Sequence, residues 1–481
     1  MQNSVTMINC LNGDKRHLNA LMQLLFLSQV RILFIFVKNH TITMARLVNC
    51  LLVFLIACST CFAQFKNIKL EDASSRHQKC EATITINKKN PNNIIAASSS
   101  NSFYYSVDGG VTWQTVKLNS PAGAIANPVL ISDDKGNIYS FHMSAPTGEG
   151  SENDKSLDKI LCHVSTDGGK TWEAGAPIGA NSKHQYKPGA TVDSKGNVWV
   201  AWTQFDKFGS DDENCQSNIL LSSSSNGKKW SKPIQIAQTP GNCQDDDNSA
   251  EGAMPAVGTD GKAFVTWSNQ NKIFLDRSFS GGGLWLTNDI AVGPQQGGWS
   301  MKVPGYERCT GTPVFLINQS KGPAQGSLFL VWADQRNGEN DTDIWFMRST
   351  NFGDNWTSPM KLGDDKNKRH QYSPWMTMDQ TTGYIYVVYF DRDNYEDNQT
   401  DVYLSYSTDN GTSFKNMKIS ETPFIPSDST MASGISSISA QKGVIVPVWT
   451  RVDGTQASLW TSVIKQTDLI QAPQQATKKK K

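Results

Sequence analysis

The stretch SVDGGVTW at residues 106–113 decides the fold, because it returns as STDGGKTW at 165–172 and as STDNGTSF at 407–414. Each copy holds a serine, an aspartate two residues later, a glycine two residues after that, and a closing aromatic residue. An aspartate in this place accepts hydrogen bonds from main-chain N–H groups of a turn, and the glycine supplies a positive φ. The pattern therefore predicts a tight turn between two strands, repeated along the chain.

Three weaker copies end at Trp230, Trp285 and Trp356 and replace the aspartate, in our alignment by Ser225, Ser280 and Asn351. Successive closing aromatics lie 55 to 59 residues apart, except for one interval of 71. We expect the tryptophans to be largely buried between sheets. The residues to which the pattern assigns a structural role are Asp108, Asp167, Asp409, Trp113, Trp172, Trp230, Trp285, Trp356 and Phe414.

Each repeat of roughly sixty residues has the layout of four short strands with turns between them. No long apolar period of 3.6 residues follows residue 65, which indicates an all-β fold. Four-stranded units in series predict a β-propeller. Counting gives seven blades, with six as the alternative. The seventh unit, 434–464, lacks a fourth strand, which Phe65–Leu70 could supply by closing the ring.

The first 63 residues differ from the repeats that follow them. Residues 1–43 are interpreted as an over-extended start, and 44–63 as a signal peptide that ends at Ala63. Cys58 lies in a lipobox-like context, so a lipoprotein is the alternative, and only lipid at Cys58 would bring the protein to a membrane. The propeller is expected over 64–466, and 467–481 as a disordered basic tail. The predicted location is secreted, periplasmic or on the cell surface.

The formal net charge of +1 gives no electrostatic case for a nucleic-acid partner. Five cysteines remain after residue 64, and none forms a Cys-x-x-Cys pair that would suggest a metal or redox motif. Cys215 and Cys243 both fall in loops on one face of the ring, so we predict a disulfide between them. No cofactor is expected, although the carboxylates of 245–247 could hold a structural Ca²⁺.

The repeats resemble the Asp-box, or bacterial neuraminidase repeat, of sialidase-like β-propellers over about residues 80–465. Segments such as VWADQRNG at 331–338 are most similar to uncharacterised secreted bacterial repeat proteins. The resemblance implies either a glycan-active enzyme or a receptor without catalysis. The sialidase motif Phe/Tyr-Arg-Ile-Pro is absent, because the one early arginine, Arg76, stands in Ser-Ser-Arg-His-Gln. Sialidases also have six blades, against seven counted here.

Ligand chemistry is expected on the face opposite the Asp-box turns, where longer loops converge. Sugar hydrolysis needs two carboxyl groups, or a tyrosine nucleophile in sialidases, and arginines bind acidic sugars bidentately. The candidate catalytic residues are Glu307, Asp334, Asp391, Tyr306 and Tyr372, and the candidate ligand-binding residues are Arg308, Arg336, Arg369, Arg392 and Arg451.

Two functions remain open at this point. The first is a glycoside hydrolase or lyase that acts on acidic or sulfated glycans, and the second is an extracellular propeller that binds a glycan or a protein without catalysis. Paired carboxyl groups beside an arginine on the loop-rich face would favour the first.

Overall fold

The computed structural model describes most of the chain after residue 64. The described ranges are 65–72, 81–98, 101–121, 125–144, 157–364, 366–426, 436–454 and 456–471. The predicted leader, signal peptide and lipid-anchored Cys58 lie outside these ranges, as do Cys80 and residues 472–481. Within the described part of the chain, no helix is long and apolar enough to cross a membrane.

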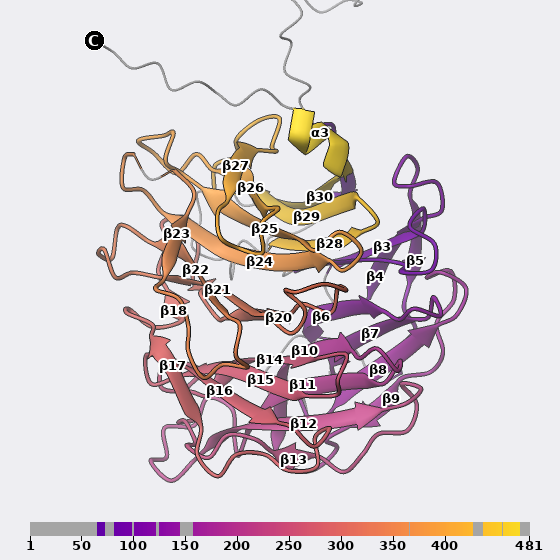
Figure 1. Ribbon diagram of the computed structural model, residues 1–481, viewed down its shortest axis with the longest axis vertical. Helices are drawn as coiled ribbons and strands as arrows, with labels where there is room; N and C mark the ends of the chain where they lie inside the picture. The colour runs from indigo at the N-terminus through magenta and orange to yellow at the C-terminus, as the bar shows by residue number, and fades with distance from the viewer. Residues whose placement is uncertain are drawn as a thin grey trace, which may run out of the picture. The chain divides into compact units, whose positions relative to one another are not determined.

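Seven antiparallel sheets form the blades of a β-propeller, so the seven-blade prediction is confirmed and the six-blade alternative is wrong (Figure 1). The strands of each blade are given from the inner to the outer one. Blade 1 consists of β2 (Ala82–Ile86), β3 (Ile94–Ser98), β4 (Ser102–Ser106) and β5 (Gln114–Lys117), and blade 2 of β6 (Ile125–Ser132), β7 (Ile138–Met143), β8 (Ile160–Ser165) and β9 (Ala176–Ile178). Blade 3 consists of β10 (His184–Val192), β11 (Val198–Phe205), β12 (Ser217–Ser224) and β13 (Ile234–Gln235), and blade 4 of β14 (Glu251–Val257), β15 (Ala263–Asn269), β16 (Lys272–Ser278) and β17 (Ile290–Pro294). Blade 5 consists of β20 (Val314–Ile317), β21 (Leu328–Asp334), β22 (Asp343–Ser349) and β23 (Met360–Leu362). Blade 6 consists of β24 (Gln371–Asp379), β25 (Tyr384–Asp391), β26 (Asp401–Ser407) and β27 (Lys415–Lys418). Blade 7 consists of β28 (Ser436–Gln441), β29 (Val444–Asp453), β30 (Gln456–Ser462) and β1 (Asn67–Asp72).

Blade 7 joins the two ends of the described chain. β1 pairs antiparallel with β30, and Asn67 lies opposite Ser462. The predicted closure by the N-terminal strand is therefore confirmed, with the strand running to Asp72 instead of Leu70. In Figure 1 the yellow strands β28 to β30 lie beside the indigo strands of blade 1. Closure matters because an open ring would expose two unpaired sheet edges.

The inner strands of all seven blades line a central cavity of about 210 Å³. Four of them, β6, β10, β14 and β24, contain an irregularity in their pairing with the next strand. In β10 the irregularity lies between Tyr186 and Gly189, and Lys187 within it has a φ of 44°. Such bulges redirect side chains out of the regular alternation of a strand. The residues at the loop-rich ends of these strands are consequently available to form a site.

The Asp-box turns connect the third and fourth strands of their blades, as predicted. Ser106 Oγ accepts a hydrogen bond from Gly110 N at 2.8 Å, and Asp108 Oδ1 accepts one from Thr112 N at 2.9 Å. Hydrogen bonds from the Thr112 hydroxyl and main chain lower the pKa of Asp108 to about 2. The carboxylate is thus held by the turn and is not available for catalysis.

The third copy of the box is one residue shorter than the others, so the assignment of Ser225 to the aspartate's place is wrong. Asn226 holds that place, because its Oδ1 accepts hydrogen bonds from Lys228 N at 2.9 Å and Lys229 N at 3.1 Å. Ser224 Oγ accepts the glycine N–H, from Gly227 at 2.9 Å. The shorter turn keeps the same hydrogen bonds with a different spacing.

The box tryptophans are largely but not fully buried, in line with the expectation. Each box packs on the preceding blade: the ring centroid of Trp172 lies 4.8 Å from that of Phe103, and Asn93 Nδ2 donates to Gly168 O at 3.0 Å. The box turns lie toward the outer edge of the blades, where one side of the ring stays near solvent. Full burial occurs instead on the second strand of four blades, at Trp202, Trp267, Trp332 and Trp449.

We expect Asp167→Ala to lower the free energy of unfolding by about 1 kcal/mol at neutral pH, the usual contribution of a capping side chain. Although partial burial opposes ionisation, hydrogen bonds from Thr171 hold the pKa of Asp167 below its usual value. Its contribution is therefore present above the pKa of an unfolded aspartate and is lost as the pH falls through the lower folded value. Urea unfolding at neutral and acidic pH measures this, with the exposed Asp211→Ala as control. Equal midpoints for the two variants at neutral pH would contradict the role of the turn.

The prediction that the chain is disordered from residue 467 is wrong for the first five residues. Helix α3 (Gln466–Gln471) follows β31 (Ile464–Lys465), which pairs with β29. Leu469 is buried, and its main-chain oxygen accepts a hydrogen bond from the Tyr406 hydroxyl at 2.9 Å. These contacts hold the helix on blade 6, and Gln466 N donates to Gly443 O of blade 7 at 2.8 Å.

Candidate functional site

A short hairpin, β18 (Ser300–Met301) and β19 (Cys309–Thr310), lies between blades 4 and 5. It accounts for the single interval of 71 residues between box aromatics. Its Arg308 reaches Asp245 in the connection from blade 3 to blade 4. Its Tyr306 packs against Tyr372 at the start of blade 6, with ring centroids 5.7 Å apart. The hairpin therefore links connections from distant blades, at the end of the ring opposite the Asp-box turns.

Lys187, Asp245, Glu251, Trp299 and Arg308 form a compact group that we call the cationic cluster. Lys187 Nζ lies 2.9 Å from Glu251 Oε2 and 3.7 Å from Asp245 Oδ1. Arg308 donates through Nη2 to Asp245 Oδ2 and through Nη1 to the Asp245 main-chain oxygen, both at 2.8 Å. The ammonium and guanidinium groups lie 4.8 Å and 5.3 Å from the centroid of the Trp299 ring. The indole supports both cations by cation–π attraction.

Two carboxyl oxygens of the cluster, Asp245 Oδ1 and Glu251 Oε1, are buried and accept no hydrogen bond from an N–H or hydroxyl group. The two carboxyl groups contact each other. Burial raises the pKa of Glu251 well above its usual value. Burial also acts on Asp245, but Lys187 and Arg308 hold its pKa below the usual value. One proton held between the two carboxyl groups would satisfy both oxygens.

The charge of the cationic cluster depends on this proton. With the proton present Glu251 is neutral, and the charges of Lys187, Arg308 and Asp245 add up to +1. The Glu251 side chain is 0% exposed, whereas that of Arg308 is 34% exposed. Solvent and ligands therefore meet the guanidinium, and the proton stays inside.

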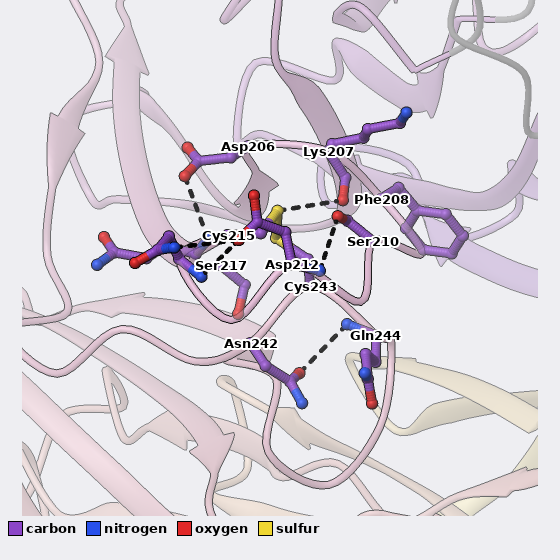
Figure 2. The surroundings of a disulfide bond; sticks show 12 residues. Asp206, Lys207, Phe208, Ser210, Asp212, Cys215, Ser217, Asn242, Cys243 and Gln244 are labelled. Carbon is purple, nitrogen blue, oxygen red and sulfur yellow. Dashed lines mark hydrogen bonds between the residues drawn. A yellow bond between two sulfur atoms is a disulfide. The ribbon is translucent and has the colours of Figure 1, made fainter.

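A disulfide, whose surroundings Figure 2 shows, holds the chain at Cys243, two residues before Asp245. Cys215, in the second loop of blade 3, bonds to Cys243, and their Cα atoms are 5.7 Å apart, so the predicted bridge is present. Cys243 O also accepts a hydrogen bond from Gly209 N at 2.7 Å. Asp245, two residues on, has a φ of 57°, which is unfavourable for a residue with a side chain. The bridge and the ion pairs together hold Asp245 in this conformation.

A second group of predicted residues surrounds Arg392, which is 1% exposed. Its Nε donates to Thr400 Oγ1 at 3.0 Å and its Nη2 to the Tyr372 hydroxyl at 3.3 Å. Tyr306 and Tyr372 are both buried, and burial raises the pKa of each hydroxyl. The sequence thus predicted residues that do lie together, but the structure encloses them.

The other predicted arginines are held by neighbouring groups. Arg336 donates hydrogen bonds to both oxygens of Asp334, from Nη2 to Oδ2 at 2.6 Å and from Nε to Oδ1 at 2.9 Å. Arg451 pairs with Asp453 at 2.6 Å. Arg369 donates to the main-chain oxygens of Glu396 and Asp397. These contacts separate the predicted arginines into several local pairs, so they do not converge on one ligand.

Two predicted carboxyl groups remain. Glu307 is exposed on the hairpin, next to Arg308. Asp391 is buried in blade 6, where its Oδ2 accepts a hydrogen bond from Gln371 Nε2 at 3.1 Å and its Oδ1 one from Asp393 N at 2.7 Å. Burial raises the pKa of Asp391 to about 7. Neither carboxyl group lies in the cationic cluster as defined above.

The three aspartates at 245–247 are the carboxylates that could hold a structural Ca²⁺ according to the sequence. In the structure each of them makes a different contact. Asp245 binds Arg308, Asp246 Oδ1 accepts a hydrogen bond from Asn248 N, and Asp247 Oδ1 accepts one from Ser300 N. Among the residues that the structure describes, no group of three or more His, Cys, Asp or Glu side chains is arranged to hold a metal ion.

Sequence reasoning missed Lys187 and Trp299 as site residues. The signal for Lys187 was present, because the segment KHQYKP at 183–188 matches RHQYSP at 369–374 except at its first and fifth positions. The fifth position is Lys187 in one copy and Ser373 in the other, and both have a positive φ. Because a serine fits the equivalent bulge of blade 6, the lysine at this position indicates that its charged side chain has a role of its own in blade 3.

Comparison with known proteins supports the repeat and the fold. The model of the BNR/Asp-box repeat matches residues 104–115 and 163–174. An ulvan lyase, from a new family of polysaccharide lyases, superposes with a TM-score of 0.50 at 12% identity, over 85% of this chain and 99% of its own. An α-L-arabinofuranosidase from Fusarium graminearum gives 0.47 at 10% identity, over 85% and 99%. The Trypanosoma rangeli sialidase gives 0.44 at 13% identity, over 84% of this chain and 60% of its own. No curated protein matches the sequence.

The chain therefore carries Asp-box repeats in a seven-bladed β-propeller, and the predicted resemblance is confirmed for the repeats. At 12% identity, the likeness to the ulvan lyase concerns the fold alone.

Proposed function

We propose that this propeller acts on acidic glycans, as a hydrolase or lyase, and that the cationic cluster is where the acidic group binds. The observation that carries the proposal is the partly exposed guanidinium of Arg308 in a cluster whose carboxyl groups, Asp245 and Glu251, are buried and paired with Arg308 and Lys187. With one proton shared by the two carboxyl groups, the cluster carries one net positive charge. A guanidinium binds a carboxylate or sulfate through two parallel hydrogen bonds.

Between the two reactions, the carboxyl geometry favours elimination. Glycoside hydrolysis by two carboxyl groups requires a separation of about 5 Å or of about 6.5–9.5 Å. Asp245 and Glu251 interact with each other inside the cluster and Glu251 is fully buried, so this pair is not placed to flank a glycosidic bond. A lyase needs a cation that stabilises the sugar carboxylate, and Arg308 with Lys187 supplies one. The disulfide between Cys215 and Cys243 supports an oxidising location outside the cytoplasm.

A non-catalytic glycan receptor is the second candidate. The observation in its favour is that Glu251 is 0% exposed, so the acid of the pair does not itself reach a ligand. Both candidates require the same acidic ligand, and product formation distinguishes them.

The experiment compares carboxylated, sulfated and neutral polysaccharides for binding and for cleavage by the purified protein. New reducing ends report either reaction, and ultraviolet absorbance of an unsaturated sugar reports elimination alone. We expect Arg308→Ala to weaken binding of the acidic polysaccharides by about 10- to 100-fold, the effect of losing hydrogen bonds to a charged group. Arg277→Ala is the matched control, because Arg277 pairs with Asp354 of an Asp-box turn. Equal binding by the two variants would place the site elsewhere.

The pH dependence provides an independent check. As the pH rises through the raised pKa of Glu251, the cluster loses its net positive charge, so acidic glycans should bind more weakly. Glu251→Gln keeps the neutral form and should flatten this dependence. A wild-type protein whose affinity does not change with pH would contradict the shared proton.

A further inference from the structure

Two histidines face each other inside blade 2, outside the cationic cluster. His142 lies in β7 and His163 in β8, and both are 0% exposed. Their Nε2 atoms are 3.0 Å apart, and their ring centroids are 5.1 Å apart. This separation is that of an N–H···N hydrogen bond.

The Nδ1 atoms of the two rings also have hydrogen-bond partners. His142 Nδ1 lies 2.9 Å from Met143 O, and His163 Nδ1 lies 2.9 Å from Glu173 O. A carbonyl oxygen only accepts, so each Nδ1 must carry a hydrogen. The contact between the Nε2 atoms then needs a third hydrogen. A neutral histidine carries one, so two neutral rings can satisfy only two of the three contacts.

The surroundings do not supply the missing hydrogen. A methyl group at Gly175 would lie 2.7 Å from His163 Nε2, so this side of the ring is closely packed. Burial keeps the neighbouring Cys162 thiol protonated by raising its pKa. Of the charged groups on adjoining elements, Glu173 pairs with Lys228, Asp158 pairs with Lys159, and Lys187 of β10 pairs with Glu251. The two imidazoles therefore have mainly each other as an ionisable partner.

We propose that His142 and His163 form a proton-binding site in which one excess proton lies between their Nε2 atoms. With the proton bound, all three contacts are made. Without it, one ring must give up either the carbonyl or the other imidazole, so the interior of blade 2 exists in two hydrogen-bonded arrangements. The occupancy of the site makes this blade sensitive to pH.

The direction of the response follows from burial. Burial lowers the pKa of both rings, to about 4 for His142. The proton is accordingly released near neutral pH and taken up as the medium becomes acidic. An unfolded chain binds one proton on each histidine over the same range, so the folded pair takes up one where the unfolded chain takes up two.

Nitrogen-detected spectra of protein labelled at histidine test the site directly, between about pH 8 and about pH 3, which extends below the lowered pKa of His142. We expect the two Nε2 signals to move together with uptake of one proton, and a coupling across the N–H···N bond in the acidic form. Two separate titrations, or no uptake over this range, would overturn the proposal. A shift of both Nε2 signals on adding Zn²⁺ or Cu⁺ at neutral pH would also overturn it, because the site would then hold a metal.

A variant pair gives a second measurement. His163→Asn places an amide near the former Nδ1 and removes the facing Nε2, so His142 should lose the coupled titration. His370→Asn is the matched control. His370 is also buried with a pKa lowered to about 4 by burial, but it faces the Thr342 hydroxyl, which can donate or accept. We expect the control to leave the His142 signals unchanged. Should His163→Asn not fold, the wild-type spectra still decide the matter.

Discussion

A chain that starts at Ala73, without β1, should lose about 5 kcal/mol of unfolding free energy and should self-associate. Five residues of β1 pair with β30, and a net contribution of about 1 kcal/mol for each hydrogen-bonded residue gives this magnitude. Removal also leaves β30 as an exposed edge strand, which can pair with another molecule. Urea unfolding measures the first effect, and light scattering measures the second.

Lys66→Ala in a chain that starts at Phe65 is the control, because Lys66 is exposed and precedes the paired residues. It should unfold at the midpoint of the parent. A shortened chain that stays monomeric with an unchanged midpoint would show that the ring does not depend on this strand.

Asp391→Asn should stabilise the protein at mildly alkaline pH by on the order of 4 kcal/mol. The pKa of Asp391 is raised from 3.8 to about 7 by burial, and each unit corresponds to about 1.4 kcal/mol. Because the folded value is the higher one, the wild type loses stability as the pH rises from that of an unfolded aspartate to about 7, and the loss is complete above it. The variant has no charge to bury. Gln371 can rotate its amide so that Oε1, which has no partner in the structure, accepts a hydrogen bond from the new side chain.

Asp334→Asn in blade 5 is the matched comparison. Asp334 occupies the equivalent end of its second strand, but its charge is balanced by the hydrogen bonds from Arg336. In blade 6 the position of Arg336 is taken by Asp393, so Asp391 lacks a cation. Asp334→Asn should therefore destabilise the protein, by about 3 kcal/mol, because it leaves a partly buried guanidinium unpaired. Thermal or urea unfolding at two pH values compares the variants, and effects of the same sign would contradict this account.

The fold could be predicted from the sequence because turn chemistry is local. The serine, aspartate and glycine of residues 106–110 make their hydrogen bonds within one turn, and a repeat of such turns predicts blades. Closure by β1 could be inferred by counting strands, since the seventh blade lacked a fourth strand and the N-terminal strand belonged to no other blade. Errors of one residue, as at Asn226, arise where a turn shortens without losing its hydrogen bonds.

The site was less predictable because its contacts join residues that are distant in the sequence. Arg308 was predicted as a ligand-binding residue, but its partner Asp245 lies 63 residues earlier, and the paired Lys187 and Glu251 are also distant in the sequence. The hairpin that brings them together left only a lengthened interval in the repeat. Charge pairing also cannot be read from a list of arginines, and Arg336 and Arg451 proved to be bound to carboxylates.

The packing of each box on the preceding blade gives the ring a direction of assembly. Gly169 of blade 2 lies against Ile95 of blade 1, Gly353 of blade 5 against Leu275 of blade 4, and Gly411 of blade 6 against Phe346 of blade 5. Each new blade thus finds its docking surface on the one made before it, so folding can follow the order of synthesis. The exception is Gly110 of blade 1, which lies against Val463 beside β30. This contact and the pairing of β1 must wait for the end of the chain, so the last step of folding joins segments almost four hundred residues apart.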